Sequence, residues 1–222
     1  IKDGYVRTKR LSELELYKFI PKGIDFVILQ PGIVIGKYDY NNYSQIFELI
    51  EKGKLSRSFG GNFIFGDAEQ IAIAHLNAFY FGKKCEHYSL GGVYSSWKNL
   101  SNTAAKLMGL KANIKSTPYF ILKFASYLFY MYAKLVGKKA LLTPQIVELV
   151  GRGIFDMNLY HKNKAKNDLR YDGEDQTMEK MVKSCLEWMQ LEGMLTKNIG
   201  SEHQLKINST NILADEKCLY QV

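Results

Sequence analysis

The sequence predicts an α/β fold built around a parallel sheet, and two neighbouring segments are the main reason. Residues 5–20 form a helix-like run with Leu11 and Leu14 on one face, and Pro21 ends it. The segment Asp25–Leu29 follows at once. Its β-branched and aromatic residues are typical of a strand buried on both faces, as strands of parallel sheets are. A helix that leads directly into such a strand is half of a βαβ unit.

The next signals alternate between helix and strand. We expect a helix over residues 42–52 and a short strand over 62–65. Asp67 then begins a strongly amphipathic helix that extends to about Phe81. Gln70 follows Asp67 by three residues, which is the spacing of a capping box with Asp67 at the N-cap.

One more buried strand is expected over residues 87–90, before Gly91 and Gly92. The rest of the chain is predicted to be mainly helical, because its periodic apolar positions begin at N-cap residues or end at glycines. The expected helices are 96–108, 119–136, 144–150 and 177–191. Residues 196–222 lose this periodicity and are expected to be a mobile tail.

Composition and charge exclude several classes of protein. With 222 residues, 46% hydrophobic and 23% charged, the chain can form a buried core, which argues against a disordered chain. Its 30 Lys and Arg exceed its 22 Asp and Glu, so the net charge is +8, but only five of the basic residues are Arg. Because nucleic-acid recognition relies on Arg, we interpret this charge as a Lys-rich solvated surface and expect no nucleic-acid partner.

The cysteines and histidines predict neither a disulfide framework nor a metal site. The three Cys lie far apart without a C-x-x-C pattern, and none of the four His pairs with a Cys at ligand spacing. A reducing, cytoplasmic location is therefore expected. The chain opens at Ile1, without an initiator Met, inside a polar helix-like run, and we expect a fragment whose N-terminal part is missing.

Residues 118–136 form a very apolar, aromatic segment. Its uncharged centre, Phe124–Ala133, has ten residues between Lys123 and Lys134, whereas a membrane-spanning helix needs about 20. One interpretation is a helix in the core or over the substrate. The other is an interfacial helix with the flanking Lys at headgroup level, which would make the protein membrane-associated.

A Tyr-x-x-x-Lys pattern carries the chemistry. Tyr5 and Lys9 stand at i and i+4 and share a helical face, so the phenol and the ammonium can converge on one substrate. A nearby cation lowers the pKa of a Tyr, which can then exchange a proton with a substrate hydroxyl or carbonyl during hydride transfer.

The bare pattern also occurs elsewhere, so its context matters. The other matches are Tyr80/Lys84, Tyr94/Lys98, Tyr119/Lys123, Tyr130/Lys134 and Tyr160/Lys164. Only Tyr5 belongs to a helix that precedes a buried strand with Pro-Gly at its carboxyl end. In open α/β sheets the ligand binds at that end of the strands.

These residues also resemble a known family. The resemblance begins with YVRTKRLSELELYKFIPKGIDFVILQPGIVIGKYD, which is similar to the second half of an extended short-chain dehydrogenase/reductase. Within that superfamily it is closest to the dihydroflavonol-reductase and 3β-hydroxysteroid-dehydrogenase-like branch, also called NAD-dependent epimerase/dehydratase. The likeness continues in family order through GGNFIFGDAEQIAIAHLNAF, HYSLGG, LLTPQIVELV and KAKNDLRYDGEDQTMEKMVKSCLEW, and it covers residues 3–192.

The resemblance implies the C-terminal part of a Rossmann-type doubly wound parallel sheet with a mostly helical substrate-binding cap. Residues 1–36 and 62–92 would form the rear part of the dinucleotide-binding domain. Residues 37–61 and 93–195 would form the cap, and 196–222 the tail. The family's Gly-rich phosphate turn, G-x-x-G-x-x-G, and its upstream catalytic Ser or Thr have no counterpart in these 222 residues.

The resemblance also implies roles for single residues. Tyr5 would be the catalytic acid–base, and Lys9 would bind the nicotinamide ribose and lower the pKa of Tyr5, so both would contact the cofactor, NAD or NADP. Asn62 and Phe63 would lie at the start of the substrate-side strand. Four residues would form the loop against the nicotinamide, namely Pro31, Gly32, Ile33 and Val34.

Three functions stand as alternatives. The first is an NAD(P)-dependent oxidoreductase that interconverts a secondary alcohol and a ketone on a small or lipid-like substrate. The second is an NAD-dependent nucleotide-sugar epimerase or dehydratase that uses the same Tyr and Lys. The third is a non-catalytic dinucleotide-binding relative or an inactive fragment. The expected partners are an apolar small molecule, a second copy of the chain through helix 5–20, and a membrane surface through 118–136.

Overall fold

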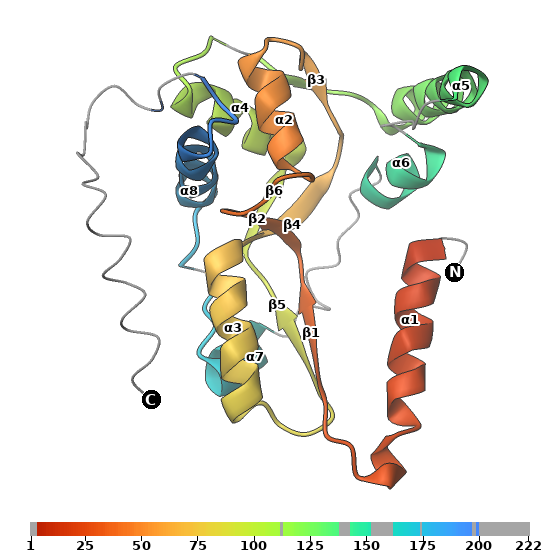
Figure 1. Cartoon of the computed structure of the whole chain (residues 1–222), viewed down its shortest axis with the longest axis vertical. Coiled ribbons are helices and arrows are strands. Elements are labelled where there is room, and N and C mark those ends of the chain that lie inside the picture. The colour runs from red at the N-terminus through yellow and green to blue at the C-terminus, as the bar shows by residue number, and fades with distance from the viewer. Residues whose placement is uncertain are drawn as a thin grey trace.

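The computed structural model of the chain describes residues 4–111, 113–137, 143–151, 162–173, 175–196 and 199. Its elements are shown in Figure 1. The helices are α1 (Gly4–Tyr17), the 3-10 helix η1 (Ile20–Lys22), α2 (Ser44–Glu51), α3 (Ala68–Phe81), α4 (Trp97–Leu107), α5 (Tyr119–Val136), α6 (Pro144–Gly151), α7 (Lys162–Leu169) and α8 (Met178–Leu191). The strands are β1 (Val27–Pro31), β2 (Ile33–Ile35), β3 (Arg57–Ser58), β4 (Asn62–Asp67), β5 (Glu86–Leu90), β6 (Val93–Ser96) and β7 (Lys115–Ser116). The predicted tail, 196–222, lies outside the described residues except for Thr196 and Ile199.

Two small sheets are joined directly along the chain, because β1 of the first sheet leads into β2 of the second. β1 pairs with β5 in parallel, and Pro31 lies opposite Leu90, so both strands end at the same level. The chain then continues through Gly32 into β2, which pairs in parallel with β4, and β4 pairs antiparallel with β6. β3 and β7 form a further parallel pair. Parallel strands connected through helices confirm the predicted α/β class.

The β1–β5 sheet packs on α3 and α7 and forms the first of two hydrophobic clusters, the α3–α7 cluster. Its buried residues are Ile71, Ala74, Ala78, Tyr88, Leu90, Ala165, Leu169 and Tyr171. α1 lies on the other side of β1 and β5 (Figure 1). The first sheet is therefore covered by helices from both sides.

The second cluster, the Trp97 cluster, lies between the β2–β4–β6 sheet and α2, α4 and α8. The indole of Trp97 is fully buried. The rings of Tyr43, Phe59, Phe63 and Phe65 surround it at centroid distances of 5.2 to 6.0 Å. Tilted and edge-to-face ring pairs at this spacing stabilise a core beyond the burial of their area.

The predicted N-cap at the start of α3 is confirmed, but the capping box is only half formed. The Asp67 carboxylate accepts hydrogen bonds from the backbone N–H groups of Glu69 and Gln70. The backbone N–H of Asp67 donates to Gln176 Oε1 at 2.8 Å instead of to Gln70. This contact joins the start of α3 to the segment before α8, 109 residues away.

Two expectations about buried faces are wrong. β1 is half-buried rather than buried on both faces. Among the described strands only β5 pairs with β1, and α1 covers its other side without burying any residue of its own. α3 is apolar on both sides rather than amphipathic, because Ile71 and Ala74 are buried while Leu76 and Phe79 are exposed.

The structure also contains elements that the sequence analysis missed. α7 is polar except for Ala165 and Leu169, which lie at i and i+4 and are both buried, so its apolar pattern is too sparse to detect. β6 is four residues long and leads directly into α4. α7 packs in the α3–α7 cluster, although its residues fall within the range predicted for the cap; the domain division stays a prediction.

Candidate active site

The site begins where the chain passes from one sheet to the other, at Gly32. The carboxyl ends of β1 and β5 meet there, and the Gly32 N–H donates to the Leu90 carbonyl oxygen at 3.3 Å. A Cβ on Gly32 would lie 3.1 Å from the Ile64 carbonyl carbon and closer still to its oxygen. Only glycine fits this close approach without displacing the β4 backbone. The carboxyl ends of parallel strands are where α/β sheets bind ligands.

Two further glycines make close backbone contacts in the same region, Gly92 between β5 and β6 and Gly173 between α7 and α8. A Cβ on Gly92 would lie 2.9 Å from the Phe65 carbonyl carbon, and one on Gly173 would lie 2.8 Å from the Gly91 carbonyl carbon. Backbone therefore packs against backbone at the ends of the strands. Such packing gives the floor of the site little freedom to move.

The buried Tyr171 holds the segment between β5 and β6 in place. The Tyr171 hydroxyl donates to the Gly91 carbonyl oxygen and accepts a hydrogen bond from Gln176 Nε2 at 3.1 Å. Burial raises the pKa of Tyr171, so its phenol stays protonated and keeps donating. Gln176 also holds the Asp67 N–H. Sequence reasoning missed this set, because its members come from distant segments.

The four residues predicted to form a loop lie at the junction, but Pro31 ends β1 and Ile33 and Val34 belong to β2, so Gly32 alone lies outside a strand. Pro31 is exposed, and Gly32 makes the close contact described above. Ile33 packs against the Trp97 cluster, and Val34 packs against the α3–α7 cluster. The consecutive side chains of Ile33 and Val34 thus enter different hydrophobic clusters, and these tertiary contacts fix the position of the backbone.

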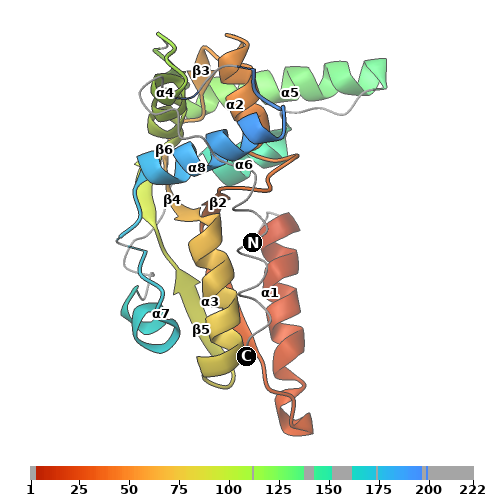
Figure 2. The ribbon, with the colours of Figure 1, turned by 60° about the vertical axis from the view of Figure 1, so that its left-hand side comes forward.

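Tyr5 and Lys9 converge on one face of α1, as their spacing requires. The Lys9 Nζ lies 5.6 Å from the centroid of the Tyr5 ring, within range of a cation–π interaction. Tyr5 is 59% exposed. Figures 1 and 2 show this end of α1 at the level of β2, near the sheet junction.

A second phenol, that of Tyr43, interacts electrostatically with the phenol of Tyr5. Partial burial raises the pKa of Tyr43 first, and the negative charges of Asp39 and of ionised Tyr5 raise it further. The Tyr43 backbone N–H donates to Asp39 Oδ2 at 2.7 Å, and its ring packs 5.3 Å from that of Trp97. Tyr43 is therefore a site candidate that sequence reasoning missed.

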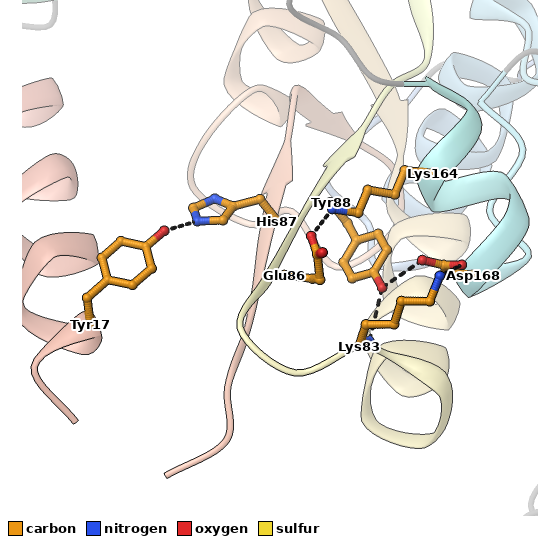
Figure 3. Close-up of polar contacts among 7 residues, drawn as sticks. All are labelled: Tyr17, Lys83, Glu86, His87, Tyr88, Lys164 and Asp168. Carbon is orange, nitrogen blue, oxygen red and sulfur yellow. Dashed lines mark hydrogen bonds and ion pairs between the residues drawn. The ribbon is translucent and has the colours of Figure 1, made fainter. Parts of the chain in front are cut away.

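Three side-chain contacts hold α1 along the first sheet. The Tyr17 hydroxyl is hydrogen-bonded to His87 Nε2 on β5 (Figure 3), and the Tyr17 ring meets that of Phe26 edge-on at 5.8 Å. Gln30 Nε2 donates to Glu13 Oε1 at 3.2 Å. Glu13 and Tyr17 thus face the sheet, whereas the predicted pair Leu11 and Leu14 is exposed.

The opposite face of β5 carries a polar cluster that fastens α7 to the sheet (Figure 3). The buried Tyr88 hydroxyl donates to Asp168 Oδ2 and accepts the Lys83 N–H, both at 3.0 Å. Lys83 Nζ lies 2.7 Å from Asp168 Oδ1, and Lys164 pairs with Glu86.

The protonation of this cluster indicates a structural role. Burial is the main cause that raises the pKa of Tyr88, and the hydrogen bond from Lys83 is the main cause that lowers the pKa of Asp168. A Tyr that transfers protons at neutral pH needs the opposite shift. Tyr88 therefore acts as a fixed hydrogen-bond donor between β5 and α7.

The two residues predicted to bind substrate differ in exposure. Asn62 is exposed at the start of β4, opposite Ser96 of β6. Phe63 is buried, with its ring 6.0 Å from that of Trp97. Phe63 thus belongs to the Trp97 cluster, and a role in substrate binding stays a prediction for both residues.

The described residues can be tested for fit to a metal or a dinucleotide. They contain no group of three or more His, Cys, Asp or Glu side chains that could hold a metal ion. The Tyr5–Lys9 pair supplies a hydroxyl and an ammonium that suit the ribose of a dinucleotide, whereas Gly32 and Gly92 pack against the β4 backbone. The sequence contains no G-x-x-G-x-x-G turn for the pyrophosphate.

Comparisons with known proteins give matches only among solved structures. No protein-family model and no curated protein matches the chain. A nucleoside-diphosphate-sugar epimerase from Pseudomonas aeruginosa has a TM-score of 0.64 at 20% identity, over 88% of this chain and 58% of that one. A UDP-glucose 4-epimerase from Thermotoga maritima has a TM-score of 0.58 at 16% identity, over 83% of this chain and 52% of that one.

A third structure, the Bordetella bronchiseptica enzyme WbmF in complex with NADH, has a TM-score of 0.58 at 13% identity, over 82% of this chain and 51% of that one. The chain thus spans little more than half the length of these three structures. Identities this low show the fold. The chain has the Rossmann-like α/β fold of these structures.

Proposed function

We propose that the chain carries the Tyr–Lys pair and the substrate-side half of an NAD(P)-dependent enzyme that acts on a nucleotide sugar as an epimerase or dehydratase. The observation that carries this proposal is the convergence of Tyr5 and Lys9 on one face of α1, within a fold that resembles nucleotide-sugar epimerases. The resemblance to the dihydroflavonol-reductase branch, stated from the sequence, remains part of the alternative below.

The proposed chemistry assigns the proton transfer to this chain. The Tyr5 phenolate takes a proton from a sugar hydroxyl, and the phenol later returns it to the ketone oxygen. The Lys9 ammonium, which lies over the Tyr5 ring, would bind the nicotinamide ribose. When bound, NAD(P) supplies the hydride acceptor and donor.

Gly32 and Tyr43 support this arrangement. The close approach of Gly32 to β4 fixes the loop of Pro31 to Val34, whose backbone would lie against the nicotinamide. Tyr43 keeps its proton because its pKa is raised, so it does not compete with Tyr5 as the base.

The second candidate is an alcohol–ketone oxidoreductase with an apolar substrate. Two observations favour it. The cap carries a long aromatic helix, α5, and the chain has only five Arg for the diphosphate of a sugar nucleotide. The two candidates differ in whether the nicotinamide is regenerated within each turnover.

The test uses the complete gene product with NAD(P) and two substrate panels, one of UDP-sugars and one of secondary alcohols. An epimerase changes the sugar without net formation of reduced nicotinamide, whereas an oxidoreductase forms it in proportion to product. Tyr5→Phe should lower turnover by about 10² to 10⁴-fold. The matched control Tyr94→Phe removes the phenol of another Tyr-x-x-x-Lys pair and should leave turnover unchanged. Equal losses of turnover in both variants would show that Tyr5 of α1 is not the specific proton-transfer residue.

A further inference from the structure

α5 presents a continuous apolar surface to solvent. Its outward side chains recur at spacings of three and four residues and are each at least half exposed: Phe120, Phe124, Tyr127, Leu128, Met131 and Leu135. At 1.5 Å per residue this stripe is about 22 Å long. Large apolar patches of this kind usually mark an interaction surface.

The attachment of α5 explains why this stripe faces outward. Only Ser126 and Ala133 are buried within the helix, and they lie seven residues apart on the face opposite the stripe. Lys123 and Tyr119 contact Glu148 of α6, so α5 is fixed to α6 by its inner side. In Figure 2 the helix extends away from the rest of the described chain. This packing is not that of a core helix.

The net charge of the protein is concentrated in the stretch of sequence that contains α5. Residues 87–147 contain eight Lys, no Arg, and no Asp or Glu. The net charge of this segment, +8, equals that of the whole chain, so the remaining residues are neutral in sum. Two of these Lys, at 123 and 134, lie on α5 itself, and Lys115 lies on β7 just before it.

α3 provides a contrast within the same molecule. It also exposes large apolar side chains, and Phe79 is 84% exposed. The segment around it contains Asp67, Glu69 and Glu86, so its charges are mixed. Among the described helices, α5 combines an apolar stripe with an excess of Lys in the sequence around it, and Glu148 is the acidic residue that contacts it.

We propose that α5 binds the surface of an anionic lipid membrane, lying in the interface plane with its stripe among the acyl chains and the surrounding Lys at headgroup level. Within the described part of the chain, no helix is long and apolar enough to cross a membrane. An apolar face combined with flanking cations is the pattern of helices that lie on a membrane. Anionic headgroups complement the +8 segment.

The experiment measures flotation of the complete gene product with vesicles of phosphatidylcholine alone and with added phosphatidylglycerol. Binding should require the anionic lipid and weaken as salt rises. Phe124→Ser should weaken it by about tenfold, because one large apolar side chain leaves the interface. The matched control Phe79→Ser removes an equally exposed ring from α3 and should have no effect.

The charge contribution is tested by a second pair of variants. Lys115→Gln with Lys134→Gln should weaken binding by about 25-fold, from about fivefold per Lys near an anionic surface. Lys37→Gln with Lys54→Gln makes the same change in net charge outside the segment and should have little effect. Phe124→Trp adds a reporter to a protein whose Trp97 and Trp188 are both buried, and its emission should shift to the blue with anionic vesicles.

Several results would overturn the proposal. Equal binding to both kinds of vesicle, or none at low salt, would exclude an anionic membrane. Loss with the Lys variants but not with Phe124→Ser would indicate a purely electrostatic polyanion surface. A Phe124-dependent dimer in sedimentation without vesicle binding would assign the stripe to a second copy. All three outcomes are independent of enzyme activity.

Discussion

The close approach at Gly32 makes a prediction whose size can be worked out from the structure. Gly32 does not have a positive φ, so Gly32→Ala tests steric contact alone. The new Cβ would lie 3.1 Å from the Ile64 carbonyl carbon and closer to the oxygen, and a backbone group in a paired strand cannot rotate away as a flexible side chain could. Overpacking of this kind costs about 1–3 kcal/mol.

A smaller effect has the opposite sign. Replacing Gly by Ala stabilises by about 0.4–1 kcal/mol because the unfolded chain loses conformational freedom. Taking the middle of each range, the net loss in the free energy of unfolding is about 1.3 kcal/mol. For a chain of this size about 2–4 °C is lost per kcal/mol, so Tm should fall by about 3–5 °C.

Thermal unfolding followed by circular dichroism measures this change. Gly4→Ala is the matched control, because its Cβ would meet nothing within 4 Å, and its Tm should rise by about 1–4 °C from the lost freedom of the unfolded chain alone. Gly92→Ala should behave like Gly32→Ala, since its Cβ would lie 2.9 Å from the Phe65 carbonyl carbon. An unchanged Tm for Gly32→Ala would refute the argument that the two sheets meet in backbone-to-backbone contact.

Three further predictions concern the site, the α7 attachment and assembly. Lys9→Met should lower both turnover and NAD(P) affinity and should shift the limb of the pH–rate profile that reports Tyr5. Tyr5→Phe should leave cofactor binding unchanged. Equal cofactor affinity in Lys9→Met and the parent would contradict the role of Lys9. Asp168→Asn should lower Tm at pH 7 and have progressively less effect as pH falls through the acid range. The pKa of Asp168 is lowered in the folded state, so the stabilisation that its carboxylate provides is present above the unfolded pKa and is lost as the carboxylate protonates. A Tm difference that is equal at pH 7 and pH 2 would contradict this. Because Leu11 and Leu14 are exposed on α1, we propose a homodimer through this helix, and Leu11→Ser with Leu14→Ser should shift the sedimentation of the complete protein from dimer to monomer; a parent protein that is already monomeric at high concentration would rule this out.

Local sequence signals were sufficient for most helices and strands. The carboxylate of Asp67, the glycine at position 137 and the apolar spacing of α8 act within a few residues, so their patterns are visible in the chain itself. The same holds for the convergence of Tyr5 and Lys9, since a shared helical face depends only on the i, i+4 spacing. α7 shows the limit of this reasoning, because two apolar residues in a polar helix are too few to form a pattern.

What the sequence by itself determined, therefore, is the α/β class, the order of its elements and a pair of residues suited to proton transfer. The tertiary structure decided the rest of the site. The Tyr171–Gly91, Asp67–Gln176 and Tyr17–His87 contacts join residues that are 70 to 109 positions apart, and no local pattern encodes such pairs. The exposure of the α5 stripe likewise depends on which face meets α6, because an apolar helix does not itself specify what covers it.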